Sequence, residues 1–259
     1  MAVSAVLLAG GYATRLYPLT KDRPKALLPL GSRVILDEVV DLLDGVPQLQ
    51  RLVLVTNHRF AEQFRQWQRR RGLNVVIVDD GTETADLRLG AIRDLLLAKT
   101  EGGAAGDLLV LGTDNLFSWP MTEFVARARR QAPHPSVALW EAPSRESATQ
   151  FGVVTLDAAS RIATFVEKSP QPPSTAVALC VYYFPEPMHG RVQQYLDSGG
   201  NPDAPGYFIE WLVRQEPTFG VPMGGTRFDI GTHAAYEEVL KAWPAVTAAA
   251  GRGRSASSS

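Results

Sequence analysis

The amino-acid sequence predicts an α/β fold with a doubly wound, mostly parallel central sheet and a smaller β-rich part behind it. Between residues 3 and 140, short apolar runs alternate with amphipathic segments at helical spacing. This alternation is typical of parallel strands covered by helices on both faces. After residue 141, strand-like runs follow one another more directly. The chain has 259 residues, 45% of them hydrophobic, which is enough to bury a large core.

The first half is predicted to place polar residues where strands end. Ligands of open α/β sheets bind beyond the carboxyl ends of the strands. The Gly10-Gly11 turn, the segment 79–81 and Asp114 all fall at such ends. The apolar runs and helical spacings predict strands at 3–8, 51–57, 74–78, 107–112 and 136–140, and helices at 34–43, 59–71, 87–98 and 121–132.

The second half is predicted to be richer in strands. Residues 1–245 are expected to form one domain with halves at 1–140 and 141–245. The remainder, 246–259, is small and Ser-rich, so we expect a disordered tail. Strands are predicted at 152–157, 162–168, 176–184, 218–223 and 226–230, and helices at 188–198, 207–216 and 231–241.

Composition argues against several classes of partner. The formal net charge of -1 provides no broad basic surface, so no nucleic-acid partner is expected. The only cysteine, Cys180, can form no internal disulfide, and a reducing cytoplasm is the simple expectation. The apolar run at 3–8 is too short for a signal peptide or a membrane span, so no membrane partner is expected. A homo-oligomer remains open.

The stretch 3–25, VSAVLLAGGYATRLYPLTKDRPK, carries the strongest functional signal. A strand runs into two glycines, which permit positive φ and the close approach of a ligand to the main chain. Two cations, Arg15 and Lys25, follow. Exposed backbone amides and fixed positive charge suit a polyphosphate. The pattern is neither the dinucleotide G-x-G-x-x-G nor the G-K-[ST] of common NTPases.

The elements LAGG, TRLYPLT and RPKALLPLG together resemble the signature of the sugar-1-phosphate nucleotidyltransferases, or NDP-sugar pyrophosphorylases, of the glucose-1-phosphate thymidylyltransferase type. The resemblance spans residues 1–243. It implies a Rossmann-like nucleotidyltransferase fold, with nucleotide bound by residues 1–140 and sugar phosphate by 141–245. It also implies a Mg²⁺-dependent condensation of an NTP with a sugar-1-phosphate, giving an NDP-sugar and pyrophosphate.

The resemblance assigns roles on the nucleotide side. Arg15 is expected at the β- and γ-phosphates, and Lys25 between the α-phosphate and the incoming phosphate. Gly81 and Thr82 correspond to the segment that reads the nucleobase, but the residues after them match no pattern for a particular base. The expected nucleotide-binding residues are Leu8, Ala9, Gly10, Gly11, Thr14, Arg15, Gly81, Thr82 and Asp114.

On the sugar side, Glu167-Lys168 resembles the family's E-K-P, and Gly152 lies in a match to Y-G-V-V. The resemblance implies that Glu167 holds sugar hydroxyls and Lys168 meets the sugar phosphate. Neighbouring side chains on a strand point to opposite faces unless the strand ends there. Cys180 is either near the sugar or a small core residue. The expected sugar-phosphate site is Lys25, Gly152, Glu167, Lys168 and Cys180, and the catalytic residues are Arg15, Lys25 and Lys168.

Asp114 and Asp229 are the expected Mg²⁺ ligands. Asp114 follows a predicted strand and Asp229 lies at the end of one, positions where a lone aspartate often caps a helix or turn. The sequence around Asp114 resembles the family's Gly-Asp, with Thr113 at the position where the family usually has glycine. Asp229 begins a D-I-G-T element. Mg²⁺ suits one or two carboxylates plus substrate phosphates.

Alternatives remain open at this stage. The acceptor could be a cyclitol phosphate, a phosphocholine-like molecule or a phosphonate, although Glu167 favours a polyol. A non-catalytic sensor of nucleotide sugars would be expected to lack one of the charged residues. A glycosyltransferase would not need the pair of Arg15 and Lys25. The transferase assignment requires Arg15, Asp114 and Asp229 to share one cleft.

Overall fold

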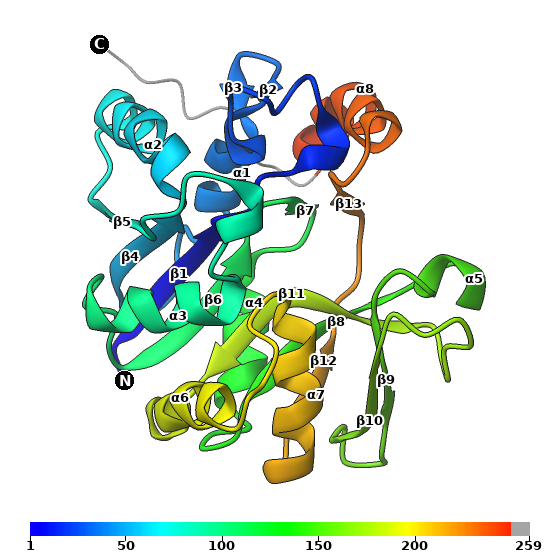
Figure 1. Cartoon of the computed structure of the whole chain (residues 1–259). Helices are drawn as coiled ribbons and strands as arrows, with labels where there is room; N and C mark the ends of the chain where they lie inside the picture. Colours follow the sequence, from blue (N-terminus) through cyan, green and yellow to red (C-terminus); the bar gives the residue numbers. More distant parts are fainter. Residues whose placement is uncertain (250–259) are drawn as a thin grey trace.

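The computed structural model describes residues 1–249 (Figure 1). The strands are β1 (Val3–Ala9), β2 (Pro29–Leu30), β3 (Arg33–Val34), β4 (Leu49–Thr56), β5 (Val75–Asp79), β6 (Asp107–Gly112), β7 (Asn115–Phe117), β8 (Ser136–Glu141), β9 (Gly152–Leu156), β10 (Ile162–Glu167), β11 (Ala176–Phe184), β12 (Phe219–Pro222) and β13 (Arg227–Asp229). The α-helices are α1 (Ile35–Asp41), α2 (His58–Arg71), α3 (Ala91–Thr100), α4 (Met121–Arg129), α5 (Arg145–Ala148), α6 (Gly190–Asp197), α7 (Pro205–Gln215) and α8 (His233–Ala249). Short 3₁₀ helices are η1 (Thr14–Leu16), η2 (Lys25–Leu27), η3 (Ala85–Leu87) and η4 (Glu186–His189).

The main sheet confirms the predicted fold class. Its strand order is β10-β9-β11-β6-β1-β4-β5, and β8 and β12 join it through β11. Strands β6, β1, β4 and β5 run parallel to one another. The strand β11 runs antiparallel to β6, β8 and β9, so it separates β8 from the parallel strands of the first half. Sequence periodicity could not show this insertion, because β11 comes later in the chain.

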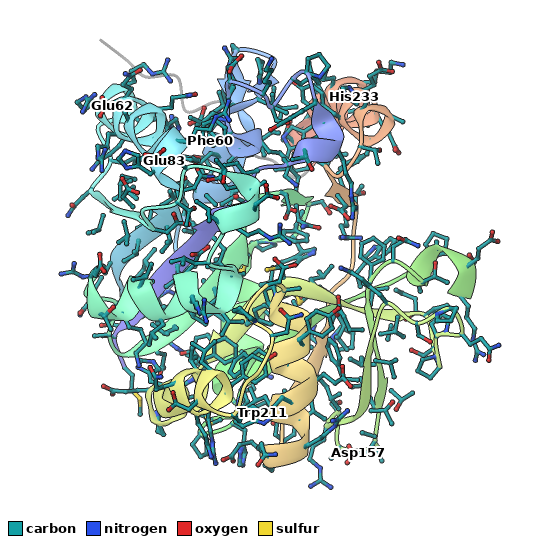
Figure 2. All side chains as sticks on the ribbon, viewed as in Figure 1. Phe60, Glu62, Glu83, Asp157, Trp211 and His233 are labelled. Carbon is teal, nitrogen blue, oxygen red and sulfur yellow. The ribbon has the colours of Figure 1, made fainter. Side chains whose placement is uncertain are left out.

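Helices cover both faces of the sheet. The alternation of side chains along β1 sends Leu7 to one face and Val6 to the other. The Leu7 face packs against α1, α2 and α4, and the Val6 face against α3, α6 and α7. On α2, Phe60 is buried toward the sheet while Glu62 is exposed at the outer edge, as Figure 2 shows. Burying one large apolar side chain contributes roughly 1.5–3 kcal/mol.

A separate two-stranded ribbon joins the two halves of the chain. In it, β13 runs antiparallel to β7, with Asp229 opposite Asn115 and Arg227 opposite Phe117. The amide of Ile230 also donates to the carbonyl of Asp114, 3.0 Å away. The ribbon therefore carries the end of the second half to the end of β6.

Two predicted boundaries are wrong. The third predicted helix, 87–98, begins only at Ala91, because Gly90 takes a φ of 92° and residues 85–87 form η3. Carbonyls of Pro202 and Asp203 accept hydrogen bonds from the first amides of α3. The final helix continues to Ala249, so residues 246–249, assigned to the disordered tail, are helical. The rest of that tail, 250–259, lies outside the described residues.

No helix within residues 1–249 combines the length and the apolar character that a membrane crossing requires.

Candidate active site

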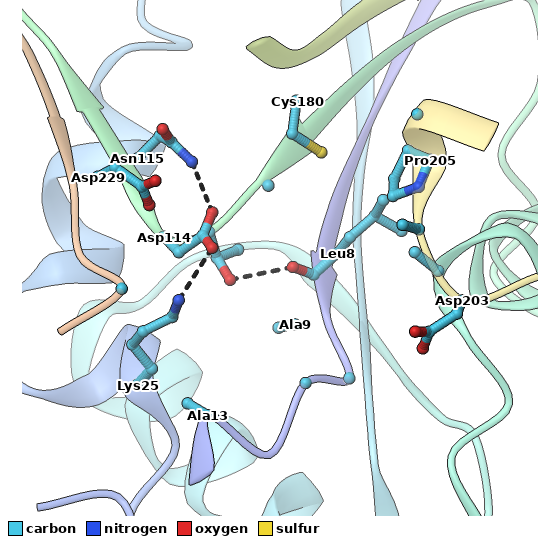
Figure 3. A pocket seen from close by; sticks show the side chains of 18 of the residues that line it. Leu8, Ala9, Ala13, Lys25, Asp114, Asn115, Cys180, Asp203, Pro205 and Asp229 are labelled. Atoms are coloured by element: carbon cyan, nitrogen blue, oxygen red, sulfur yellow. Dashed lines mark hydrogen bonds and ion pairs between the residues drawn. The ribbon is translucent and has the colours of Figure 1, made fainter. Parts of the chain in front are cut away.

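A cavity of about 640 Å³ opens where β1, β5 and β6 end. Both halves of the chain line it. All the predicted site residues except Gly81 and Thr82 are part of its wall. Figure 3 shows Lys25, Asp114, Asn115 and Asp229 on one side and Asp203 and Pro205 on the other. The required common cleft for Arg15, Asp114 and Asp229 is therefore present.

The glycine turn is built differently from the expectation. Neither Gly10 nor Gly11 has a positive φ, whereas Ala13 does, at 48°. Gly10 is favoured for a steric reason instead, because a Cβ at this position would lie 2.5 Å from Oδ2 of Asp94. The hydroxyl of Tyr12 donates to the carbonyl of Thr82, 2.9 Å away, and anchors the turn against the loop after β5.

Arg15 lies on η1 at the rim of the cavity. Its side chain is exposed, and no hydrogen bond or ion pair engages its guanidinium among residues 1–249. A planar fork of five N–H donors free at a cavity rim suits a phosphate ligand.

Lys25 and Asp114 form an ion pair in the cavity wall. The ammonium Nζ lies 2.9 Å from Oδ2 of Asp114, and Nδ2 of Asn115 donates to Oδ1 at 2.7 Å. Burial by itself would raise the pKa of Asp114. The ammonium of Lys25 and these hydrogen bonds outweigh it and hold the pKa below its usual value. Asp114 therefore carries a full negative charge.

Thr113, in the position where the family usually has glycine, does not block the cavity. Its side chain is buried, and its hydroxyl donates to the carbonyl of Leu8, 3.0 Å away (Figure 3). The threonine thus ties the end of β6 to the end of β1.

Asp229 reaches the same wall through the β13–β7 ribbon. Burial and the nearby charge of Asp114 raise its pKa, and the guanidinium of Arg227 opposes this rise. Arg227 Nη2 lies 3.3 Å from Oδ2 of Asp229, and Nε donates to Oδ1 of Asn115 at 2.9 Å. Two carboxylates at one cavity wall, with no group of three or more His, Cys, Asp or Glu ligands in the described residues, leave ligand positions to substrate oxygens and water. This donor set fits Mg²⁺ better than zinc.

Sequence reasoning missed Arg227. It is 7% exposed in its side chain and lies between two rings, with its guanidinium carbon 5.3 Å from the centre of Trp140 and 4.6 Å from that of Phe151. The two predicted strand-end acids therefore meet around a buried arginine. Its position two residues before the D-I-G-T element gives no local signal, because the rings come from β8 and the segment before β9.

Glu167 and Lys168 both line the cavity, although neighbours on a strand would diverge. The strand β10 ends at Glu167, and Lys168 takes a left-handed φ of 50°. Lys168 Nζ lies 3.9 Å from Oε1 of Glu167. Two glycines make room for the carboxylate: a Cβ would lie 2.0 Å from Oε2 at Gly206 and 2.8 Å from it at Gly152. Burial raises the pKa of Glu167.

Cys180 is a half-buried residue of the cavity wall. Burial and the charge of Asp114 raise the pKa of its thiol to about 12, so it stays protonated and is not a nucleophile. Gly112 separates the two groups, since a Cβ there would lie 3.1 Å from both Sγ of Cys180 and Oδ1 of Asp114.

The loop after β5 also differs from the expectation. Gly81 and Thr82 do not line the cavity, but Asp80 and Asp94 do. The buried Thr82 supports Asp80, whose Oδ1 accepts from the amide and the hydroxyl of Thr82, each at 2.7 Å. Asp79 and Asp80 end a predicted strand, which is a signal for Asp80. Asp94 lies inside a predicted helix and has no such signal.

Together, an open α/β sheet and a cavity that brings cations and two strand-end carboxylates to one place suit a nucleotide or another polyphosphate. A family model described as nucleotidyl transferase matches residues 4–245. The chain belongs to the nucleotidyl transferase family.

Individual relatives are distant. The chain is 24% identical over 230 residues to the "Bifunctional protein GlmU" of Methanocaldococcus jannaschii, covering 88% of this chain and 51% of the relative. It is 26% identical over 235 residues to the "UTP--glucose-1-phosphate uridylyltransferase AglF" of Haloferax volcanii, covering 88% and 91%. The chain thus spans about half the length of some curated relatives and nearly all of another.

The fold is also found in a solved structure. A Bacillus anthracis protein assigned as a glucose-1-phosphate thymidylyltransferase, crystallised with sucrose, superposes with a TM-score of 0.78 at 20% identity, covering 92% of this chain and 94% of that one. At this identity the likeness concerns the fold.

Proposed function

We propose that this protein transfers a nucleotidyl group from an NTP to a sugar-1-phosphate, releasing pyrophosphate. The observation that carries the proposal is the convergence of Arg15, Lys25, Asp114, Asp229 and Lys168 on one cavity. The family supports it, and so do relatives named as uridylyl-, adenylyl- and guanylyltransferases acting on sugar-1-phosphates.

The chemistry requires charge neutralisation and alignment. The phosphate oxygen of the acceptor attacks the α-phosphorus of the NTP, and the bond to the β-phosphate oxygen breaks. The phosphate nucleophile is already ionised, so no general base is needed. The main barrier is repulsion between two anions, which fixed cations in a cavity reduce without reorganisation.

The cations divide this work by position. Arg15, exposed at the cavity and without an ion pair among residues 1–249, binds the β- and γ-phosphates and stabilises the charge that develops on leaving pyrophosphate. Lys25, at the wall with Asp114, neutralises the α-phosphate and the incoming oxygen. Lys168, on the opposite half of the chain, holds the acceptor phosphate.

Glu167 supports a polyol acceptor. It is a mostly buried carboxylate whose one ion-pair partner in the described chain is the loosely placed Lys168. Hydroxyl groups can satisfy its oxygens. Asp114 and Asp229 would hold Mg²⁺, which lowers the charge of the bound phosphates when present.

The test is a panel of ATP, CTP, GTP, UTP and dTTP against several hexose-1-phosphates, with pyrophosphate release as the readout. Release should require both substrates and Mg²⁺. Arg15→Ala should reduce kcat/KM about 100- to 1,000-fold, as loss of a preorganised charge partner does. Arg70→Ala removes an exposed arginine of α2 outside the cavity and serves as the matched control.

Three outcomes would overturn the proposal. One is the absence of pyrophosphate release with every pair of substrates. Another is full activity of Arg15→Ala. A third is sugar transfer from an NDP-sugar with no use of NTP, which would indicate a glycosyltransferase. A cyclitol phosphate or phosphonate that reacts better than every hexose-1-phosphate would retain the reaction and change the acceptor.

A further inference from the structure

Apart from Asp203, which pairs with Arg88, two carboxylates in the cavity have no role in the chemistry above. Asp94, on the first turn of α3, is 4% exposed, and its Oδ1 has no hydrogen-bond partner among the described residues. Asp80 follows β5. Their Oδ2 atoms lie 2.5 and 3.4 Å from the point where a Cβ on Gly10 would be. An unpartnered buried carboxylate costs free energy, so a ligand that satisfies it would be favoured.

This acidic pair is not suited to phosphate. Neither carboxylate forms an ion pair within residues 1–249, and the nearby arginine, Arg88, is bound to Asp203, with Nε 2.6 Å from Oδ1. The first amides of α3 are occupied by carbonyls of residues 202 and 203. An anion placed here would meet two carboxyl groups and an arginine that is already paired with Asp203. The triphosphate must therefore lie toward Arg15 and Lys25, and the uncharged end of the nucleotide toward the acidic pair.

Several cavity residues close to this pair in the chain suit a flat aromatic ring. Gly90 and Ala91 precede Asp94, and Leu8 precedes Gly10; these residues and Ala85 line the cavity and are apolar or lack a side chain, and Tyr12 and Arg88 line it too. Gly10 cannot carry a Cβ beside Asp94, which keeps the main chain close to the two acids. The sugar-phosphate residues Glu167 and Lys168 come from a different part of the cavity wall, on the second half of the chain.

The bases differ in what they offer to a carboxylate. Adenine, cytosine and guanine each carry an exocyclic amino group that donates hydrogen bonds. Uracil and thymine carry carbonyl oxygens there, with one N–H between them, so two carboxylates would face lone pairs. Burial and the neighbouring Asp80 also raise the pKa of Asp94 to about 7, so above that pH the group is ionised and can only accept hydrogen bonds.

We propose that Asp94, supported by Asp80, selects an amino-bearing nucleobase and rejects uracil and thymine. The inference rests on the proposed function, because it assumes that the cavity binds an NTP. It assigns a specificity-determining residue that the sequence pattern did not indicate. Relatives named for uridylyl, adenylyl and guanylyl transfer do not decide the base for this chain.

The experiment measures equilibrium binding of ATP, CTP, GTP, UTP and dTTP by calorimetry, with Mg²⁺ and without an acceptor. At least one amino-bearing NTP should bind the wild-type protein about tenfold or more tightly than UTP and dTTP, because only that base can donate a hydrogen bond from an amino group to the carboxylate. Asp94→Asn offers amide donors to a base carbonyl, so the ratio should shift toward UTP and dTTP. Asp94→Ala should reduce the preference without reversing it.

Asp44→Asn, at a carboxylate outside the cavity, is the matched control and should leave every ratio unchanged. The inference is overturned if UTP or dTTP binds the wild-type protein as well as the best amino-bearing NTP. Equal weakening of all five NTPs by Asp94→Asn would overturn it too, because it would indicate a structural or metal-binding carboxylate. Binding of no NTP would overturn both proposals. The expected binding ratios with no pyrophosphate release would refute the proposed function alone.

Discussion

Two pairs of carboxylates lie beside the ends of strands in the same sheet, and only one pair has cations. Asp114 and Asp229 are accompanied by Lys25 and Arg227. Asp80 and Asp94 have no such partners in the described chain. The pKa of Asp114 is lowered, while that of Asp94 is raised to about 7. All four residues are aspartates, so the difference comes from their surroundings. The pair with cations suits charged ligands, and the pair without them suits neutral hydrogen-bond donors.

The largest expected effect is a loss of activity when the pair of Asp114 and Asp229 is changed. Asp229→Asn keeps the shape of the side chain and removes its charge. It should reduce kcat/KM about 100- to 1,000-fold with every NTP, because one of the two carboxylates that would hold the phosphate-bound Mg²⁺ loses its charge. Pyrophosphate release with all five NTPs measures this, and circular dichroism checks the fold.

Asp94→Asn should instead change the ranking of the NTPs. If Asp229→Asn altered the base preference and left the highest rate unchanged, the proposed difference in role between the two pairs would be wrong.

A second effect concerns stability against pH. The folded pKa of Asp94 is about 7, against an ordinary value of 3.8. Between these values the folded protein holds a proton that the unfolded chain has released, so the free energy of unfolding falls as pH rises from about 4 to about 7 and is constant above that. The loss amounts to a few kcal/mol, at about 1.4 kcal/mol per pKa unit.

Urea denaturation of wild type and Asp94→Asn between pH 4 and 8 measures that difference. The variant has no carboxyl group at this position, so its curve should be flatter by this amount. Identical slopes would show that Asp94 titrates normally and would remove the contrast between the pairs.

The third prediction tests the contact between the glycine turn and the acidic pair. Gly10→Ala places a Cβ 2.5 Å from Oδ2 of Asp94 and should lower the free energy of unfolding by about 1–3 kcal/mol. Gly11→Ala is the control, because a Cβ there has nothing within 4 Å and the residue has no positive φ.

The cost of Gly10→Ala should shrink in an Asp94→Ala background, as expected for two groups in contact. A full cost in both backgrounds, measured by urea denaturation, would place the crowding elsewhere.

The smallest expected effect concerns the hydrogen bond between Thr113 and Leu8, which joins the ends of β6 and β1. Thr113→Val keeps the volume of a buried side chain and removes the hydrogen bond to the carbonyl of Leu8. It should cost about 0.5–1.5 kcal/mol of stability, as a single neutral hydrogen bond does. Denaturant unfolding measures it, and an unchanged or higher stability would mean that the end of β6 needs no such tie to β1.

The sequence by itself determined the elements and the family. Apolar periodicity located the parallel strands and most helices, because alternation and helical spacing are local properties of the chain. The glycine turn with Arg15 and Lys25, and the text around Asp114 and Asp229, carried the resemblance that the family model confirms. The same information placed most of the candidate site at the strand ends, where the cavity lies.

Only the tertiary structure decided which charges meet. Asp229 reaches Asp114 because β13 pairs with β7, and a pairing between such distant segments depends on the whole fold. The left-handed backbone of Lys168 turns it into the cavity beside Glu167, against the strand alternation. Asp94 faces Gly10 because α3 packs beside β1, so a helix residue with no local signal becomes part of the site. Local patterns fix secondary structure, whereas charge and burial depend on neighbours brought from elsewhere in the chain.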